Sequence, residues 1–220
     1  MATSGEAVPP IAVPPVELGV EIPPEPPEVT ARGLYVASRL LAGATTFFFL
    51  GFVFAYFYLR ALNQNDMWRP AHVKPEQGLG AAIIACVLVS AVLAYLAGRQ
   101  MNRGESGWLT PASVAILLGV VAFALQAVEY SQQSFGPTDG AYASVFIAWT
   151  ACYMVAVVGA LYWLETQVAT EVRARRSPSR RDGDIRNPDR LIAPGLSAAA
   201  FYWAFLAAIG AITYIVLYLL

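Results

Sequence analysis

The sequence places a few polar side chains within long apolar runs. Gln126 and Glu129 stand three positions apart near the end of one such run, and Tyr130 follows directly. Residues three apart lie on one face of a helix, so both side chains can tie this helix to a neighbouring one. An unpaired polar group in hydrocarbon is costly, and Gln126 therefore needs a partner from elsewhere. We expect a polar knot at the helix end; a transport or proton site is the alternative.

The other candidate residues do not indicate a metal or a catalytic site. Membrane haem and copper sites are built mainly from imidazoles, and His72 is the single histidine. Cys86 and Cys152 lie in separate apolar runs without CxxC spacing, so neither a disulfide framework nor a zinc site is predicted. No span contains a nucleophile with a base or a paired carboxylate set. We predict that this chain binds no cofactor by itself.

The composition is that of a membrane protein. Of the 220 residues, 57% are apolar and 13% are charged, against about a quarter charged in soluble proteins. The net charge of −1 argues against nucleic acid as a partner. A helix needs about 20 apolar residues to cross about 30 Å of hydrocarbon. The sequence predicts an all-α bundle of five transmembrane helices, at about residues 34–61, 78–98, 108–129, 141–168 and 191–220.

Two polar segments border the predicted transmembrane domain of residues 34–220. Residues 1–33 are rich in proline and glutamate and are expected to form a disordered tail, because they cannot bury enough apolar surface to fold. Residues 169–190 form an arginine-rich loop that could contact anionic headgroups. Loop arginines mark the cytoplasmic side, so we expect the N-terminus in the cytoplasm and Leu220 outside.

Small residues at every fourth position predict where the helices pack. Such residues let helix backbones approach closely in a membrane, where lipid tails are as apolar as leucine. They occur in three helices, at Ala82, Cys86, Ser90, Ala94 and Gly98, at Ser144, Ala148, Cys152, Ala156 and Ala160, and at Ala200, Ala204 and Ala208.

An ordered set of short motifs runs through residues 34–220. It consists of 51–60 (GFVFAYFYLR), Trp68-Arg-Pro70, 126–130 (QAVEY), 139–146 (DGAYASVF) with Thr150, and 201–205 (FYWAF). In order and spacing, these motifs resemble subunit III of the haem-copper oxidases, in the five-helix form that lacks the first two helices. The orientation expected from the arginines agrees with this resemblance.

The sequence also departs from that family at interior polar positions. Thr45 stands where the family usually has a glutamate in its first shared helix. Both histidines of the family motif that begins at Thr150 are absent, and the aspartate expected in the last helix is Ala207. Family roles that depend on those side chains are therefore in doubt here.

The resemblance implies a non-catalytic accessory subunit in the inner membrane of a bacterium. Such a subunit packs against catalytic subunit I, with subunit II in the same complex, binds phospholipid, and supports proton uptake and durability of the haem-copper centre. Haem and copper are then expected in the partner subunits, which reduce oxygen to water with electrons from cytochrome c or quinol. Arg39, expected in the first turn of the first helix, could reach a lipid phosphate or another subunit. The candidate lipid or subunit contacts are Arg39, Arg60, Trp68, Gln126, Glu129 and Tyr130.

Two other functions fit parts of the sequence. The same motifs would suit the small subunit that accompanies a nitric oxide reductase, and the co-purifying partner would distinguish the two. An independent transporter is the other alternative. Transporters usually show internal repeats, broken helices and polar groups at the membrane midplane, and five unequal, uninterrupted helices argue against one.

Overall fold

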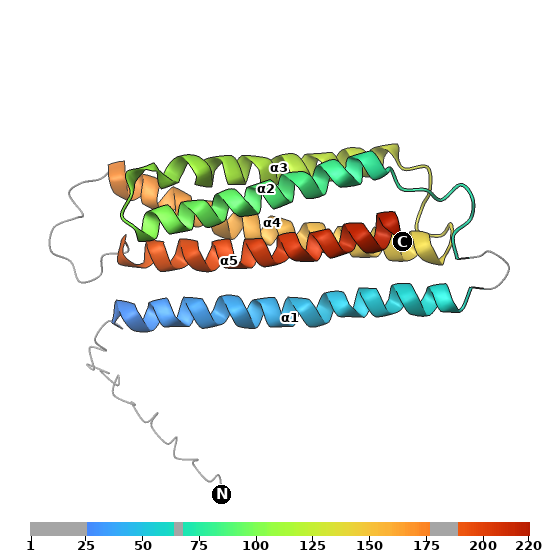
Figure 1. Cartoon of the computed structure of the whole chain (residues 1–220), viewed down its shortest axis with the longest axis horizontal. Coiled ribbons are helices and arrows are strands. Elements are labelled where there is room, and N and C mark those ends of the chain that lie inside the picture. The colour runs from blue at the N-terminus through green and yellow to red at the C-terminus, as the bar shows by residue number, and fades with distance from the viewer. Residues whose placement is uncertain (1–25, 64–67, 177–188) are drawn as a thin grey trace, which may run out of the picture.

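The structure is a bundle of helices in which each helix runs antiparallel to the one before it in the sequence (Figure 1). The computed structural model describes residues 26–63, 68–176 and 189–220, and these contain helices and turns but no strand. Within these ranges, five helices are long and apolar enough to cross a membrane, which confirms the predicted fold class. They lie side by side, with α1 at one edge (Figure 1). Their bounds are α1 Pro27–Ala61, α2 Gln77–Asn102, α3 Leu109–Gln132 after a 3₁₀ turn at Ser106–Trp108, α4 Ala141–Arg176, and α5 Asp189–Tyr214 with a π-helical turn at Ile215–Leu219.

The helices are longer than the apolar runs that predict them. α1 begins at Pro27 rather than near residue 34, and α4 continues to Arg176 rather than ending near residue 168. Apolarity marks only the part of a helix that crosses hydrocarbon, and beyond it headgroups and water can solvate charged side chains. Residues 27–33 are therefore helical. Residues 1–25 of the expected tail and 177–188 of the arginine-rich loop lie outside the described residues.

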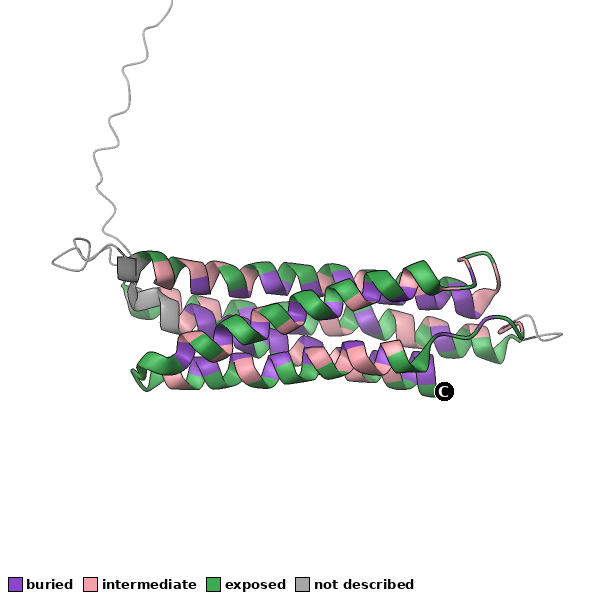
Figure 2. Cartoon of the chain, turned by 90° about the horizontal axis from the view of Figure 1, so that it is seen from above, coloured by how far each residue is buried: buried purple, intermediate pink, exposed green. Residues whose placement is uncertain are grey.

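α1 is the most peripheral helix of the bundle. It packs against α4 and α5, whereas α2 packs against α3 and α5, and α4 packs against α3 and α5. In the most apolar window of α1 only 17% of the residues are buried, against 50% in α4 and in α5. The burial pattern follows this order, with the buried residues on the inward faces of the helices (Figure 2).

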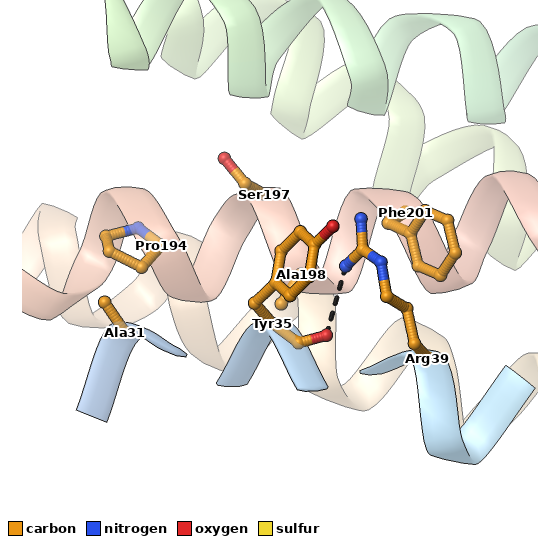
Figure 3. Close-up of a pocket in the computed structure, with 7 residues that line it drawn as sticks. All are labelled: Ala31, Tyr35, Arg39, Pro194, Ser197, Ala198 and Phe201. Atoms are coloured by element: carbon orange, nitrogen blue, oxygen red, sulfur yellow. Dashed lines mark hydrogen bonds between the residues drawn. The ribbon is translucent and has the colours of Figure 1, made fainter. Parts of the chain in front are cut away.

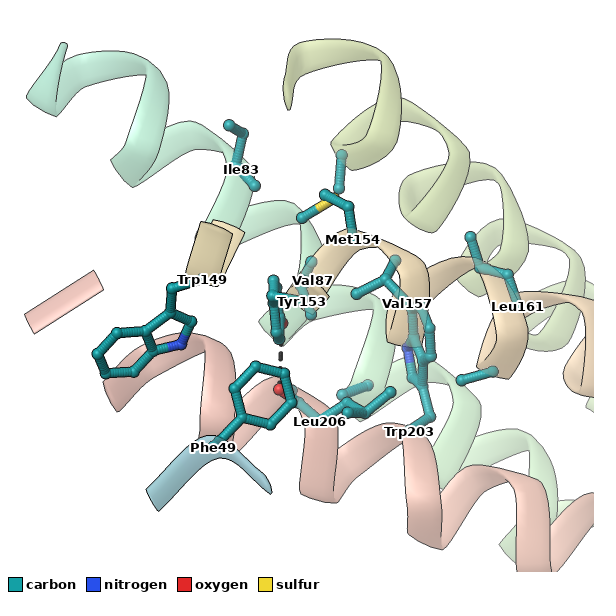
Figure 4. Close-up of a cluster of buried hydrophobic side chains, with 14 of the residues drawn as sticks. Phe49, Ile83, Val87, Trp149, Tyr153, Met154, Val157, Leu161, Trp203 and Leu206 are labelled. Carbon is teal, nitrogen blue, oxygen red and sulfur yellow. Dashed lines mark hydrogen bonds between the residues drawn. The ribbon is translucent and has the colours of Figure 1, made fainter. Parts of the chain in front are cut away.

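Trp203 of α5 lies at the centre of the bundle and is fully buried. Its indole Nε1 donates a hydrogen bond to Ser90 Oγ of α2 at 2.9 Å, and Ser90 Oγ donates to the Ala115 carbonyl of α3 at 2.6 Å. Gly119 of α3 leaves room for Leu161 of α4 and for this indole, because a Cβ at Gly119 would overlap Leu161 and press closely on Trp203. Figure 4 shows Trp203 and Leu161 pointing into the same cluster. One side chain therefore joins three helices.

The small-residue stripes are only partly confirmed. In α2 the stripe is buried from Ser90 onward. In α5 the prediction is wrong, because Ala204 and Ala208 are exposed while Trp203 and Ala207 face the core. A step of four residues turns a helix by about 400°, so a strict fourth-residue stripe drifts by about 40° at each step. Such a stripe cannot keep facing one straight neighbour.

Candidate functional site

A buried polar cluster lies at the end of the bundle that holds the C-terminus. Gln126 Nε2 donates to Glu129 Oε2 at 2.7 Å. The Tyr218 hydroxyl, from the π-helical turn, donates to the same carboxyl, 2.8 Å from Oε1 and 3.0 Å from Oε2. Gln126, Glu129 and Tyr218 are 4%, 3% and 6% exposed. The carboxyl of α3 is thus held by its own helix and by the last turn of the chain.

Tyr130 takes a different partner from its neighbours in the sequence. Its hydroxyl is 2.7 Å from Thr150 Oγ1 of α4, and Thr150 Oγ1 is also within 2.7 Å of the Phe146 carbonyl. The expected knot of Gln126, Glu129 and Tyr130 therefore divides into two contacts, one toward the end of α5 and one toward α4. Sequence reasoning missed Tyr218, because no spacing connects it with Glu129.

The last turn of the chain is fixed by side chains from other helices. The carbonyls at a helix C-terminus have no partner within the helix. Here Gln77 Nε2 donates to the Tyr218 carbonyl at 3.0 Å, and the Tyr142 hydroxyl donates to the Leu217 carbonyl at 2.5 Å. Gly80 of α2 lies against the Tyr218 ring, where a Cβ would overlap it. These contacts hold the Tyr218 hydroxyl on the Glu129 carboxyl.

Trp68 attaches the loop between α1 and α2 to the start of α4. Its ring packs edge to face on Tyr56 and Tyr142, at centroid distances of 5.1 and 5.7 Å, and its carbonyl accepts from the Tyr142 amide at 3.0 Å. Arg60 is exposed beside it, with Nη1 3.5 Å from the Tyr56 hydroxyl. Trp68 is therefore buried within this chain, whereas Arg60 is accessible from outside.

Arg39 lies near the opposite end of the bundle, between α1 and α5. Its guanidinium carbon is 3.2 Å from the Tyr35 ring centroid and 4.5 Å from that of Phe201, and Nη1 donates to the Tyr35 carbonyl at 3.1 Å. The sequence predicts Arg39 in the first turn of this helix. Because α1 begins at Pro27, Arg39 instead lies more than three turns into the helix. No carboxylate among the described residues forms an ion pair with it.

The guanidinium of Arg39 borders a cavity of about 230 Å³, which we call the arginine pocket (Figure 3). Such a cation with free N–H groups suits an anionic ligand such as a phosphate. The pocket is lined by Ala31, Tyr35, Arg39, Pro194, Ser197, Ala198 and Phe201.

A second, larger hollow lies between α1 and α4. Its volume is about 480 Å³, and its lining is almost entirely apolar. Thr45 borders this hollow, at the position where the family that this chain resembles usually has a glutamate. Its Oγ1 is 3.0 Å from the Tyr202 hydroxyl of α5. In this chain that position joins α1 to α5 rather than presenting a carboxyl. The other lining residues are Ala44, Phe48, Phe49, Ala151, Cys152, Val155 and Ala156.

Within the described ranges, no three histidine, cysteine, aspartate or glutamate side chains lie close enough together to hold a metal ion. Both cysteines are free thiols, and His72 is exposed. The described part thus contains polar contacts that join helices, and cavities between helices.

Comparison with known proteins assigns this architecture to a family. The family described as cytochrome c oxidase subunit III matches residues 27–220. Cytochrome c oxidase subunit 3 of Gallus gallus is 28% identical over 193 residues, which are 85% of this chain and 69% of the relative. The proteins of the same name from Ornithorhynchus anatinus and Mus musculus are 25% and 24% identical, over 87% and 86% of this chain and 71% and 70% of those relatives. Because the match spans all five helices, this chain belongs to the cytochrome c oxidase subunit III family.

Proposed function

We propose that this chain supports the assembly, lipid binding and stability of the catalytic subunit of a cytochrome c oxidase. Membership of the family makes it an accessory subunit III of a haem-copper oxidase, in a complex with the catalytic subunits. The family match over residues 27–220 carries this proposal. The geometry supports this proposal, since three buried polar side chains form hydrogen bonds to other helical segments of the bundle. They are Glu129, Thr150 and Trp203.

The redox chemistry would then belong to the partners. Haem and copper in subunits I and II would reduce oxygen to water, with electrons delivered by cytochrome c. The helix bundle of this chain would lie beside the catalytic subunit and bind lipid on its surface. The relatives named cytochrome c oxidase subunit 3 do not favour a nitric oxide reductase subunit or an independent transporter. We place the chain in the bacterial inner membrane, with the N-terminus in the cytoplasm and Leu220 outside.

Removal of the chain tests its supporting role. Oxidase purified from cells that lack this chain should keep the haem absorption of its catalytic subunits. Its half-life under continuous turnover should be shorter than that of the complete complex. An unchanged half-life would contradict the supporting role.

The arginine pocket is the best candidate for a phospholipid headgroup. Arg39 has no acidic partner within the described part of the chain, and it lies between two aromatic rings that fix its guanidinium in place. A long arginine side chain within a transmembrane helix can extend to the headgroup layer. The pocket lies at the end of the bundle that we place on the cytoplasmic side, where anionic lipids are enriched.

Substituting Arg39→Leu should therefore reduce the phospholipid retained by the purified complex. A hydrogen bond to a charged group contributes about 1.5–3 kcal/mol, which corresponds to about tenfold weaker binding or more on its loss. Native mass spectrometry of the complex would measure the retained lipid. Arg32→Leu is the matched control, because Arg32 is exposed at the same end of α1 but does not line the pocket. Equal lipid content in both variants would exclude Arg39 as the headgroup contact.

A further inference from the structure

A small cavity lies beside the polar cluster, at the junction of α2, α3, α4 and α5. Its volume is about 20 Å³. A cavity needs about 10–15 Å³ of such volume to hold one water molecule, and the water needs two to four polar partners. The size therefore suits a single water. The cavity is lined by Gly80, Ile83, Ile84, Gln126, Thr150, Tyr153, Met154, Gly210, Thr213, Tyr214 and Tyr218.

The lining offers unused hydrogen-bonding capacity from three helices. Gln126 is 4% exposed, and while its Nε2 donates to Glu129, its Oε1 accepts no hydrogen bond from a described group. Thr213 of α5 is 4% exposed and donates to the Ile209 carbonyl at 2.9 Å, which leaves lone pairs on its oxygen. Tyr153 of α4 likewise donates to the Leu206 carbonyl at 3.1 Å (Figure 4). Acceptors thus surround the cavity, and the second N–H of Gln126 is a donor without a described partner.

We propose that this cavity binds one water molecule that links α3 to α4 and α5. The water donates to Gln126 Oε1 and to the hydroxyl oxygen of Thr213. A purely apolar cavity of this size would stay dry, but this one is lined by an amide and by hydroxyl groups that can bond a water. Bound there, the water completes the hydrogen bonds of the residue that holds Glu129.

A glycine of α5 shapes one wall of the cavity. Gly210 forms part of its wall, and a Cβ at this position would overlap the Tyr153 hydroxyl. The glycine therefore lets the α4 tyrosine reach across to α5 and close one side of the cavity.

The substitution Thr213→Val tests the bound water by the sign and size of its effect. Valine has nearly the shape of threonine but offers the water no partner. We expect the melting temperature of this chain in its intact native complex to fall further than in Thr46→Val. Thr46 is the matched control, since it makes the same bond to the carbonyl four residues earlier, Ala42, at 2.8 Å, but does not line the cavity. Equal shifts, or a rise for Thr213→Val, would indicate a dry cavity and overturn the proposal.

A density map of the same intact complex gives an independent result. At a resolution that reveals interior waters, we expect a peak at about 2.6–3.2 Å from Gln126 Oε1, and its loss in Gln126→Leu. A map with waters elsewhere in this chain but no peak at this position would overturn the proposal. Neither result depends on which partner subunits the complex contains, so the proposal can fail while the assigned function stands.

Discussion

Replacing Trp203 by alanine is expected to lower the free energy of unfolding of this chain by about 3 kcal/mol, the lower end of the range for buried tryptophan in protein cores. The lower end applies because a bilayer supplies no hydrophobic transfer term between helices, while the lost packing contacts remain. The substitution also leaves Ser90 of α2 without the indole donor. Denaturation of the purified complex, monitored through a signal that is specific to this chain, would measure the loss of unfolding free energy.

The control for Trp203→Ala is Phe54→Ala, because Phe54 is 69% exposed on α1 and packs no core. Trp203→Phe should fall between the two, since it keeps an aromatic ring but removes the hydrogen bond to Ser90. If Trp203→Ala is no more destabilising than Phe54→Ala, the central position of the indole in the bundle is contradicted.

Tyr218→Phe is expected to destabilise the chain by about 1–3 kcal/mol, the cost of leaving a buried acceptor with a missing partner. The variant keeps the ring against Gly80 but removes the donor from both oxygens of Glu129. The same denaturation measurement applies. Tyr95→Phe, at a side chain 54% exposed on α2, is the control and should change the stability little.

A double-mutant cycle makes the test of this contact specific. If the Tyr218 hydroxyl acts through the Glu129 carboxyl, the effects of Tyr218→Phe and Glu129→Gln on the free energy of unfolding should not add. The difference should be about 0.5 kcal/mol or more, as for residues in direct contact. Additive effects would show that the two side chains stabilise the chain independently, contrary to the geometry of the polar cluster.

The sequence predicts the number and course of the helices well, because the hydrocarbon layer imposes a length and a composition on each span. The helix ends are less predictable. Nothing in the apolar pattern indicates that α1 starts at Pro27, since a helix in the headgroup layer no longer needs apolar residues. Because the helix starts earlier than predicted, Arg39 lies deeper in it than the expected first turn.

The polar cluster could be predicted only in part. The spacing of Gln126 and Glu129 indicates a shared face, and the structure does join them. Their partner Tyr218 lies 89 positions from Glu129 in the chain and meets it only because the fold brings the last turn of the chain within reach of α3. The small-residue rule failed in α5 for a related reason, because the face that a helix presents depends on neighbours that its own sequence does not specify.

The assignment of all redox chemistry to partner subunits is tested most directly by purification through a tag on this chain, in mild detergent, with an absorption spectrum before and after the chain is separated from its partners. We expect the intact complex to contain the catalytic oxidase subunits and to show haem absorption, and the separated chain to be colourless. Haem or copper bound to the separated chain, or a complex without a haem-copper subunit, would contradict this assignment.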